Sequence, residues 1–208
     1  AINAMAGGGS LITLPLLVFA GVPPTVANGT NRVAIAVQSL TAVASYRSAG
    51  QLPWEPTRRL LLPNLLGAVA GAFVATRLSE AAFRPIVAAI LLGMAALLLL
   101  RPKSIVEPAP PDALHGPVAA FLGLFAVGLY GGFIQAGVGF FYLAALVRGQ
   151  GLAVVAANGV KVALVCLVTL ASLLVFLWAG QIDWRAGLVL SVGMGLGGWL
   201  GARLAIRG

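Results

Sequence analysis

The sequence predicts an all-α membrane protein, a polytopic bundle of transmembrane helices built from two internal repeats that each contain a glycine-broken helix. Three observations predict this fold class. Hydrophobic residues make up 60% of the 208-residue chain, charged residues 9%, and the mean hydropathy is +1.02, whereas soluble domains carry about 25% charged residues. Several apolar runs reach the ~20 residues that a helix needs to cross a bilayer. The chain also resembles itself after 130 positions.

The expected helices follow the apolar runs. We expect a first helix over 1–20, broken at Gly7–Gly9, and unbroken helices over 25–48, 58–78 and 83–100. Residues 101–113, RPKSIVEPAPPDA, form a polar linker, because prolines and mixed charges are typical of surface connections. The second half contains an apolar stretch over 114–148, broken around Gly137–Gly139, and helices over 152–179 and 185–206. The two predicted transmembrane repeats therefore cover residues 1–100 and 114–208.

The internal repeat becomes visible when the chain is aligned with itself at a shift of 130 positions. Residues 6–77 then fall on residues 136–207 without a gap, and 20 of the 72 aligned positions are identical. Such self-similarity indicates a duplicated unit. The matching runs include Ala6-Gly7-x-Gly9 with Ala136-Gly137-x-Gly139, Ala27-Asn28-Gly29 with Ala157-Asn158-Gly159, and Ala49-Gly50-Gln51 with Ala179-Gly180-Gln181.

The repeat has two consequences for topology. Residues 114–133 should have a counterpart before residue 1, and the helix at 83–100 should have one after residue 208. We therefore expect the chain to be a trimmed inner part of a two-repeat protein with about eight spans. If the stretch 114–148 crosses the membrane once, the repeats are parallel. If it folds back as a re-entrant hairpin, they are inverted.

The two glycine breaks are candidate parts of a solute site. A broken helix at membrane depth leaves main-chain N–H groups without helical partners, and these groups attract an anion. Irregular backbone is tolerated there where it is buried in protein or lines a cavity. The alternative interpretation is close helix packing, which glycine also allows. The candidates are Gly7, Gly8, Gly9 and Ser10 at the first break, and Gln135, Gly137 and Gly139 at the second.

The starts of the two long helices supply the remaining candidates, Asn28, Thr30, Asn31, Asn158 and Lys161. Asn28 and Asn158 have an alternative role as helix N-caps. An ionisable residue inside apolar sequence marks a functional site by default, so we favour anion binding by Lys161 over snorkelling of its side chain to the interface. For Arg32 we favour snorkelling. Because Lys161 aligns with Asn31, the two repeats would present one cationic and one amide donor.

Other function classes find little support in the composition. One histidine and five acidic residues form no cluster with metal-ligand spacing, and no nucleotide-binding glycine loop followed by Lys-Ser/Thr occurs. We therefore expect no enzyme, no metal and no cofactor. The net charge of +8 comes from basic residues spread over the expected helix ends, which is typical of headgroup contacts and orientation signals rather than of nucleic-acid binding.

The motifs resemble those of a known family. The run GGGSLITLPLLVFAGVPPTVANGTNRVA followed by SYRSAGQLPW is similar to the first-repeat signature of the sulfite exporter TauE/SafE family, and GVGFFYLAALVRGQGLAVVAANGVKV followed by LWAGQIDW to its second. The resemblance covers nearly the whole chain. It implies transport of small sulfur-containing anions or organic acids, such as sulfite and sulfonates. The second repeat departs from the pattern, because Val138 replaces a glycine and Val160-Lys161 replaces Thr-Asn.

Together these features predict a multi-pass secondary transporter of the bacterial inner membrane that exports a small anion by alternating access between two repeats. Its partners would be the anion and the lipid bilayer. The motif Gly67-x-x-x-Gly71 would let helices pack closely, either between repeats or between subunits of a homo-oligomer. Two alternatives stay open, namely a transporter of another small solute class and a membrane assembly factor without transport activity.

Overall fold

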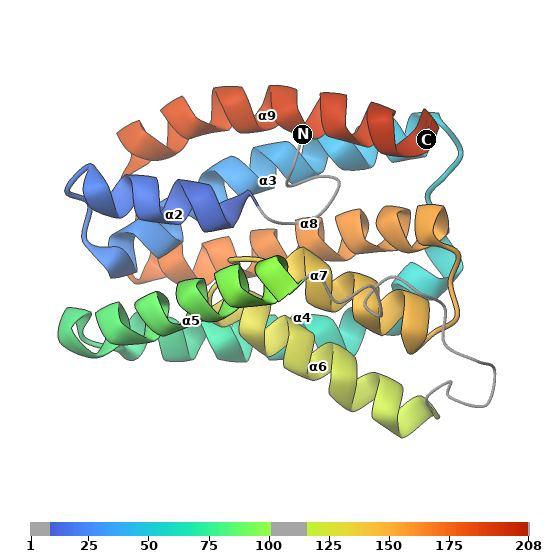
Figure 1. Cartoon of the computed structure of the whole chain (residues 1–208), viewed down its shortest axis with the longest axis horizontal. Coiled ribbons are helices and arrows are strands. Elements are labelled where there is room, and N and C mark those ends of the chain that lie inside the picture. The colour runs from blue at the N-terminus through green and yellow to red at the C-terminus, as the bar shows by residue number, and fades with distance from the viewer. Residues whose placement is uncertain (1–8, 101–115, 208) are drawn as a thin grey trace.

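The computed structural model describes residues 9–100 and 116–207, and over those ranges its secondary-structure elements are all helices, joined by turns and short loops. Figure 1 shows a bundle in which the long helices lie side by side. The helices are α2 (Ser10–Phe19), α3 (Pro24–Ser48), α4 (Trp54–Arg77), α5 (Glu80–Leu100), α6 (Pro117–Phe133), α7 (Val138–Leu143), the π-helical turn η3 (Ala144–Arg148), α8 (Val154–Trp178) and α9 (Trp184–Arg207). The predicted all-α fold class is confirmed.

The observed helices match the predicted ones closely in the described ranges. The largest difference is at α4, which begins at Trp54 rather than at residue 58, because Pro53 ends the preceding turn and leaves the next residues free to start a helix. The predicted linker 101–113 lies outside the described residues. Gly7 and Gly8 of the first predicted break also lie outside them.

Four helices of the described chain are long and apolar enough to cross a membrane, namely Trp54–Arg77, Glu80–Leu97, Val154–Trp178 and Trp184–Ile206. Helix α3 is as long as these helices, with 25 residues, but more polar. Its polar first half is buried, including Asn28, Thr30, Asn31 and Arg32. The bundle therefore shields polar groups of α3 that would be costly to expose to hydrocarbon.

Helices α3 and α8 run antiparallel and contact each other through matched glycines at their starts. A Cβ atom added at Gly29 would come within 2.0 Å of the carbonyl oxygen of Gln181, just after α8. A Cβ atom added at Gly159 would come within 2.4 Å of the carbonyl oxygen of Gln51, just after α3. The beginning of each helix therefore lies against the chain that follows the other helix.

Helices α4 and α6 run parallel and approach closely along a line of glycines. A Cβ atom at Gly67 or Gly71 of α4 would come within 2.1 Å of a main-chain carbonyl oxygen of α6, and one at Gly128 or Gly132 within 2.2 Å of a carbonyl oxygen of α4. Small residues permit such backbone contact between membrane helices. The predicted packing role of Gly67-x-x-x-Gly71 is thus confirmed as a contact between helices of one chain.

The apolar stretch 114–148 folds back on itself, so the hairpin alternative is the one observed. Helix α6 ends at Phe133, and α7 begins after Gly137, whose φ of 71° lies in the left-handed region that glycine adopts at low cost. The rings of Tyr130 in α6 and Phe141 in α7 then meet edge to face, with centroids 5.0 Å apart. This hairpin brings the second predicted break into the middle of the bundle.

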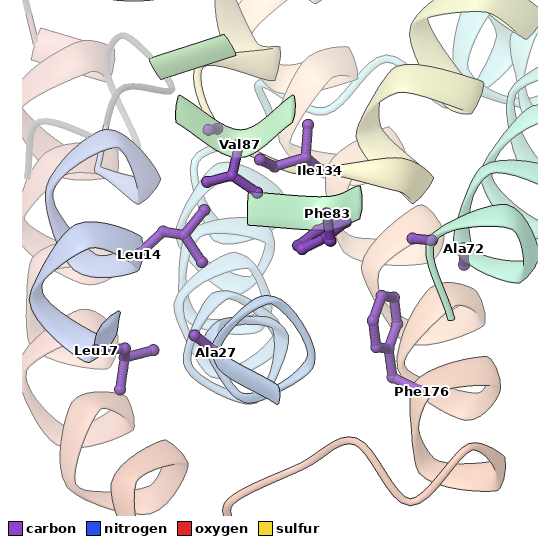
Figure 2. Packing of buried hydrophobic residues seen from close by; sticks show 10 residues of the cluster. Leu14, Leu17, Ala27, Ala72, Phe83, Val87, Ile134 and Phe176 are labelled. Carbon is purple, nitrogen blue, oxygen red and sulfur yellow. The ribbon is translucent and has the colours of Figure 1, made fainter. Parts of the chain in front are cut away.

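The hydrophobic core holds this arrangement together. Figure 2 shows one cluster, in which Leu14 and Leu17 of α2 lie beside Ala27 of α3, with Phe83 of α5 and Phe176 of α8 nearby. Ile134, in the turn of the hairpin, belongs to the same cluster. The cluster joins five helices, α2, α3, α4, α5 and α8, at one end of the bundle and packs the hairpin turn against them.

Candidate functional site

A small cavity lies between the two halves of the chain. It is lined by α2 and α3 on one side, by α7 and α8 on the other, and by the hairpin turn. Its volume is about 30 Å³, which is room for about two water molecules. The lining residues are Ser10, Ile35, Gln38, Ser39, Ala42, Gln135, Val138, Gly139, Lys161, Val162 and Val165.

Lys161 is the one charged side chain among these lining residues. It lies two turns into α8 and is only 2% exposed. Its Nζ donates a hydrogen bond of 2.7 Å to Oδ1 of Asn158, one turn earlier on the same helix. The side chain is therefore held inside the protein, and the snorkelling alternative for Lys161 is wrong.

Gln135 is another polar residue of the cavity wall. It lies in the hairpin turn and is 3% exposed. Its Nε2 donates to the hydroxyl oxygen of Thr169 on α8, while its Oε1 is buried and has no hydrogen-bond partner among the described residues. A buried acceptor without a partner is costly and requires a physical reason.

Helix α2 brings the first predicted break to the cavity. Gly9 directly precedes the helix, and Ser10 is buried and lines the cavity. One turn later, the hydroxyl of Thr13 donates to Oδ1 of Asn31 at 2.7 Å. Asn31 therefore supports the position of α2 from the neighbouring helix and is not among the lining residues.

Two polar residues of α3 bind other parts of the chain instead of the cavity. Nδ2 of Asn28 donates to the carbonyl oxygen of Phe133 at 2.8 Å. The hydroxyl oxygen of Thr30 accepts the main-chain N–H of Asp183 at 2.8 Å. Both bonds cross from α3 to the second half of the chain, so these side chains tie the two halves together.

Arg32 is fully buried, so the predicted snorkelling of this side chain is wrong. Its guanidinium donates to the carbonyl oxygens of Gly131 at 3.1 Å and Gly132 at 2.5 Å, and it lies 4.6 Å from the centre of the Phe176 ring. These carbonyls are in the last turn of α6, which carries the negative end of the helix dipole. The end of α6 thus accepts hydrogen bonds from both terminal nitrogens of Arg32, while Nε of Arg32 is buried and has no hydrogen-bond partner among the described residues.

Comparison with known sequences identifies the family. The sequence model described as sulfite exporter TauE/SafE matches residues 1–208. The chain belongs to the sulfite exporter TauE/SafE family. The family resemblance seen in the glycine-rich runs and in the Gly-Gln pairs at 50–51 and 180–181 is thereby confirmed.

Curated relatives of this TauE/SafE chain carry transporter names. The probable membrane transporter protein ORF9 of Sinorhizobium sp is 29% identical over 99% of the chain and 78% of its own length. YfcA of Escherichia coli K12, also named a probable membrane transporter protein, is 27% identical over 99% and 76%. A relative in Haemophilus influenzae is 29% identical over 99% and 80%. No solved structure matches the chain.

The family, the relatives and the spanning helices agree on the general function. This TauE/SafE chain is a membrane transporter rather than an enzyme. It is a multi-pass protein of the bacterial inner membrane, in contact with lipid, and it moves a small molecule.

The TauE/SafE fold brings together some of the predicted site residues and separates others. Ser10, Gln135, Gly139 and Lys161 line the cavity. Gly9 and Gly137 directly precede lining residues, and Asn158 accepts a hydrogen bond from Lys161, whereas Asn28, Thr30 and Asn31 bond elsewhere. Gly7 and Gly8 lie outside the described residues.

The sequence prediction missed several lining residues, chiefly Ile35, Ser39 and Ala42. Helical spacing would have found them. Ile35 and Gln38 follow Asn31 by four and seven positions, which places them on one face of a helix. Val165 follows Lys161 by four positions in the same way.

Proposed function

We propose that the chain is a secondary transporter of small anions, with sulfite, sulfonates or related organic acids as its solutes. The observation that carries this proposal is the buried ammonium group of Lys161, which lines the cavity between the two halves. Ionisable side chains inside membrane proteins commonly mark solute pathways. An anion in the cavity would lie against the ammonium group of Lys161.

The two buried cations have different surroundings, which further supports an anionic solute. The guanidinium of Arg32 donates hydrogen bonds to carbonyl oxygens at the end of α6, so this side chain stabilises the packing of α3 against α6. Lys161 donates to a neutral amide, Asn158. Among the described residues that line the cavity there is no carboxylate, and a cationic solute would meet the positive charge of Lys161 without compensation.

Transport would proceed by alternating access between two inverted repeats, residues 1–100 and 114–208, joined by the linker 101–113. The reciprocal contacts of Gly29 with Gln181 and of Gly159 with Gln51 support this organisation. The two glycines are 130 positions apart, and so are the two glutamines, so each contact is the repeat counterpart of the other. The antiparallel course of α3 and α8 favours inverted over parallel repeats. In such transporters, one repeat rocks against the other around a site at their interface.

Export of an anion would be driven by the membrane potential. An anion that leaves a negative cytoplasm gains ~2.3 kcal/mol per charge for each 100 mV. This coupling needs no buried carboxylate to carry protons. Two other functions remain as outcomes of the test, namely transport of a different solute class and a role in membrane assembly.

Flux of radiolabelled sulfite in proteoliposomes tests the proposal. We expect saturable flux in the wild type and a loss of about 100-fold in Lys161→Met, because removing one partner of a buried charge interaction costs several kcal/mol. The matched control is Arg58→Met, which removes an exposed cation at a helix start and should leave flux unchanged. Unchanged flux in Lys161→Met would refute the assignment of the cavity at Lys161 as the solute site. Absence of flux for every sulfur or organic anion would refute the proposal that the chain transports anions.

A further inference from the structure

We propose that a groove between the C-terminal halves of α3 and α9 binds the headgroup of an anionic phospholipid, with Arg203 as its cationic contact. The groove lies at the right-hand end of the bundle in Figure 1, where α3 and α9 end and α4 and α8 begin. Its volume is about 640 Å³, which is within the usual range of small-molecule sites. It shares no lining residue with the cavity at Lys161, so this inference is independent of the proposed solute.

Arg203 supplies the positive charge of the groove. Its guanidinium carbon lies 4.0 Å from the centre of the Trp199 ring, a cation–π contact that helps to hold the side chain in place. In the described part of the chain the one ion pair joins Glu55 and Arg59, so no described carboxylate pairs with Arg203. The planar guanidinium offers several N–H donors in a geometry that suits a phosphate group. A phosphodiester anion therefore fits both the charge and the donors of this position.

Hydroxyl groups of α3 form the opposite wall of the groove. Thr41, Ser45 and Ser48 line it and follow each other by four and three positions, which places them on one face of the helix. Ser45 and Ser48 donate to carbonyl oxygens of α3 itself, at 2.9 Å and 3.0 Å. Because a hydroxyl oxygen also accepts hydrogen bonds, these groups can pair with the hydroxyls of a phosphoglycerol headgroup.

The arginines of α9 and α4 indicate that Arg203 lies at the level of the lipid headgroups. A helix rises about 1.5 Å per residue, so Arg185 and Arg203 of α9 are about 27 Å apart along the helix axis. Arg59 and Arg77 of α4 have the same spacing in the sequence. Since the hydrocarbon core of a bilayer is about 30 Å thick, each pair places one cation near each boundary of this core.

An exposed apolar strip runs from Arg203 toward the middle of α9. Leu196, Trp199, Leu200 and Arg203 follow the spacing of one helical face. The two leucines are 62% and 48% exposed, and in a membrane such side chains contact acyl chains. A phospholipid therefore fits this surface better than a free phosphate does, because its headgroup lies at Arg203 while its acyl chains lie along the leucines.

The other repeat lacks these polar groups at the counterpart positions, so the helices can pack without them. At a shift of 130 positions, Arg203 corresponds to Phe73, and Ser48 corresponds to Trp178. Phe73 and Trp178 are both exposed and lie near the ends of α4 and α8, at the opposite end of the bundle from the groove. The polar groove is thus a feature of one end only.

The end of the bundle that carries the groove is also the more basic one. The described arginines near helix ends are Arg47, Arg58, Arg59, Arg148, Arg203 and Arg207 at this end, and Arg77, Arg84 and Arg185 at the other. Basic residues gather on the cytoplasmic side of membrane proteins. This excess places the groove in the cytoplasmic leaflet, where anionic lipids attract basic segments.

Native mass spectrometry of the purified chain in detergent tests the inference. The anionic probe is phosphatidylglycerol, and the net-neutral probe is phosphatidylcholine with the same acyl chains. We expect the wild type to bind phosphatidylglycerol about tenfold more tightly, because the choline group adds a positive charge near Arg203 and offers no hydroxyl to α3. Glycerol 1-phosphate, which has the headgroup without acyl chains, should compete about 100-fold more weakly than the lipid.

The variant Arg203→Gln should bring the ratio between the two lipids close to one, while Arg203→Lys, which keeps the charge without the planar fork, should retain a ratio of about three. Two controls remove other exposed arginines and should keep the tenfold ratio. Arg58→Gln alters the same end of the bundle outside the groove, and Arg77→Gln alters the other end, where the guanidinium carbon lies 4.5 Å from the centre of the Phe73 ring.

Three results would overturn the inference. They are equal binding of the two lipids by the wild type, competition by glycerol 1-phosphate as strong as that by the lipid, and a ratio in Arg203→Gln that does not fall below that in Arg58→Gln. The first two use the wild-type chain and decide the question without any variant. Because Arg203 is exposed, Arg203→Gln should keep the melting temperature of the wild type, which shows that a lost preference comes from the groove.

Discussion

Gly29 lies directly against the main-chain carbonyl group of Gln181, with no room between them for a side chain. A Cβ atom at Gly29 would come within 2.0 Å of the carbonyl oxygen and 3.1 Å of the carbonyl carbon. The counterpart contact of Gly159 with the carbonyl oxygen of Gln51 has the same character. In each half of the chain, the turn that follows the long helix thus packs against the start of the long helix of the other half. This reciprocal contact resembles an isologous interface between two subunits.

The variant Gly29→Ala should destabilise the protein by about 2 kcal/mol, because the added methyl group meets main-chain atoms that move only with their helix. The expected effect on the melting temperature in detergent is a decrease of about 5 °C. The control Gly93→Ala adds the same methyl group on α5, where no atom lies within 4 Å. It should leave the melting temperature equal or slightly raised, since alanine favours helix more than glycine does. Equal melting temperatures for the two variants would contradict the close contact.

The α4–α6 contact gives a second prediction with both variants on one helix. In Gly132→Ala, the new Cβ would come within 2.0 Å of the carbonyl oxygen of Ala68, whereas in Gly123→Ala it would meet open space. We expect the first variant to lose about 2 kcal/mol of stability and the second to lose none. Thermal unfolding followed by tryptophan fluorescence measures the difference, and a loss in Gly123→Ala as large as in Gly132→Ala would exclude the contact as its cause.

The sequence predicted the helices well because apolar runs, glycines and prolines act locally. The break in 114–148, the packing face of Gly67-x-x-x-Gly71 and the end of α3 before Gly50 all follow from such local signals. Lys161 was also singled out correctly as a buried residue, because its ionisable group lies in apolar sequence on both sides.

The sequence prediction failed where the structure depends on partners far along the chain. Arg32 was expected at the interface, yet it binds carbonyl groups 99 and 100 positions away. Nothing near Arg32 in the sequence indicates those acceptors, since they become unpaired only where α6 ends. Asn28 and Thr30 were predicted to bind the solute for the same reason. Their hydrogen-bond partners, Phe133 and Asp183, lie far from them along the chain.

Arg32 should be essential for stability but not for recognition of the solute charge. The variant Arg32→Met leaves the carbonyl oxygens of Gly131 and Gly132 without their donors and should cost about 3 kcal/mol. Arg32→Lys keeps a cation that can reach one of the two oxygens, so about half of the loss should be recovered. In sulfite flux, Arg32→Lys should retain the KM of the wild type. A KM raised by an order of magnitude in Arg32→Lys would mean that the guanidinium contacts the solute.

Glu80 provides the last prediction, at the end of the bundle where α5 meets α3. One carboxylate oxygen, Oε1, accepts the main-chain N–H of Thr25 at 3.1 Å and also the hydroxyl group of Thr25. Thr25 lies in the first turn of α3, whose N–H groups have no helical partners. The side chain of Glu80 therefore acts as an N-cap supplied by a different helix, and its charge suits the positive end of the α3 dipole.

Replacing this cap should have a graded effect on stability. Glu80→Ala removes the acceptor and should cost about 1 kcal/mol, the usual value of an N-cap. Glu80→Gln keeps an oxygen acceptor and loses only the charge, so its cost should be about 0.5 kcal/mol. The control Glu55→Ala breaks the exposed pair with Arg59, in which the Glu55 side chain is 67% exposed, and such surface pairs contribute at most a few tenths of a kcal/mol. If thermal unfolding showed the same loss for Glu55→Ala as for Glu80→Ala, the contact with Thr25 would contribute nothing beyond an ordinary surface charge.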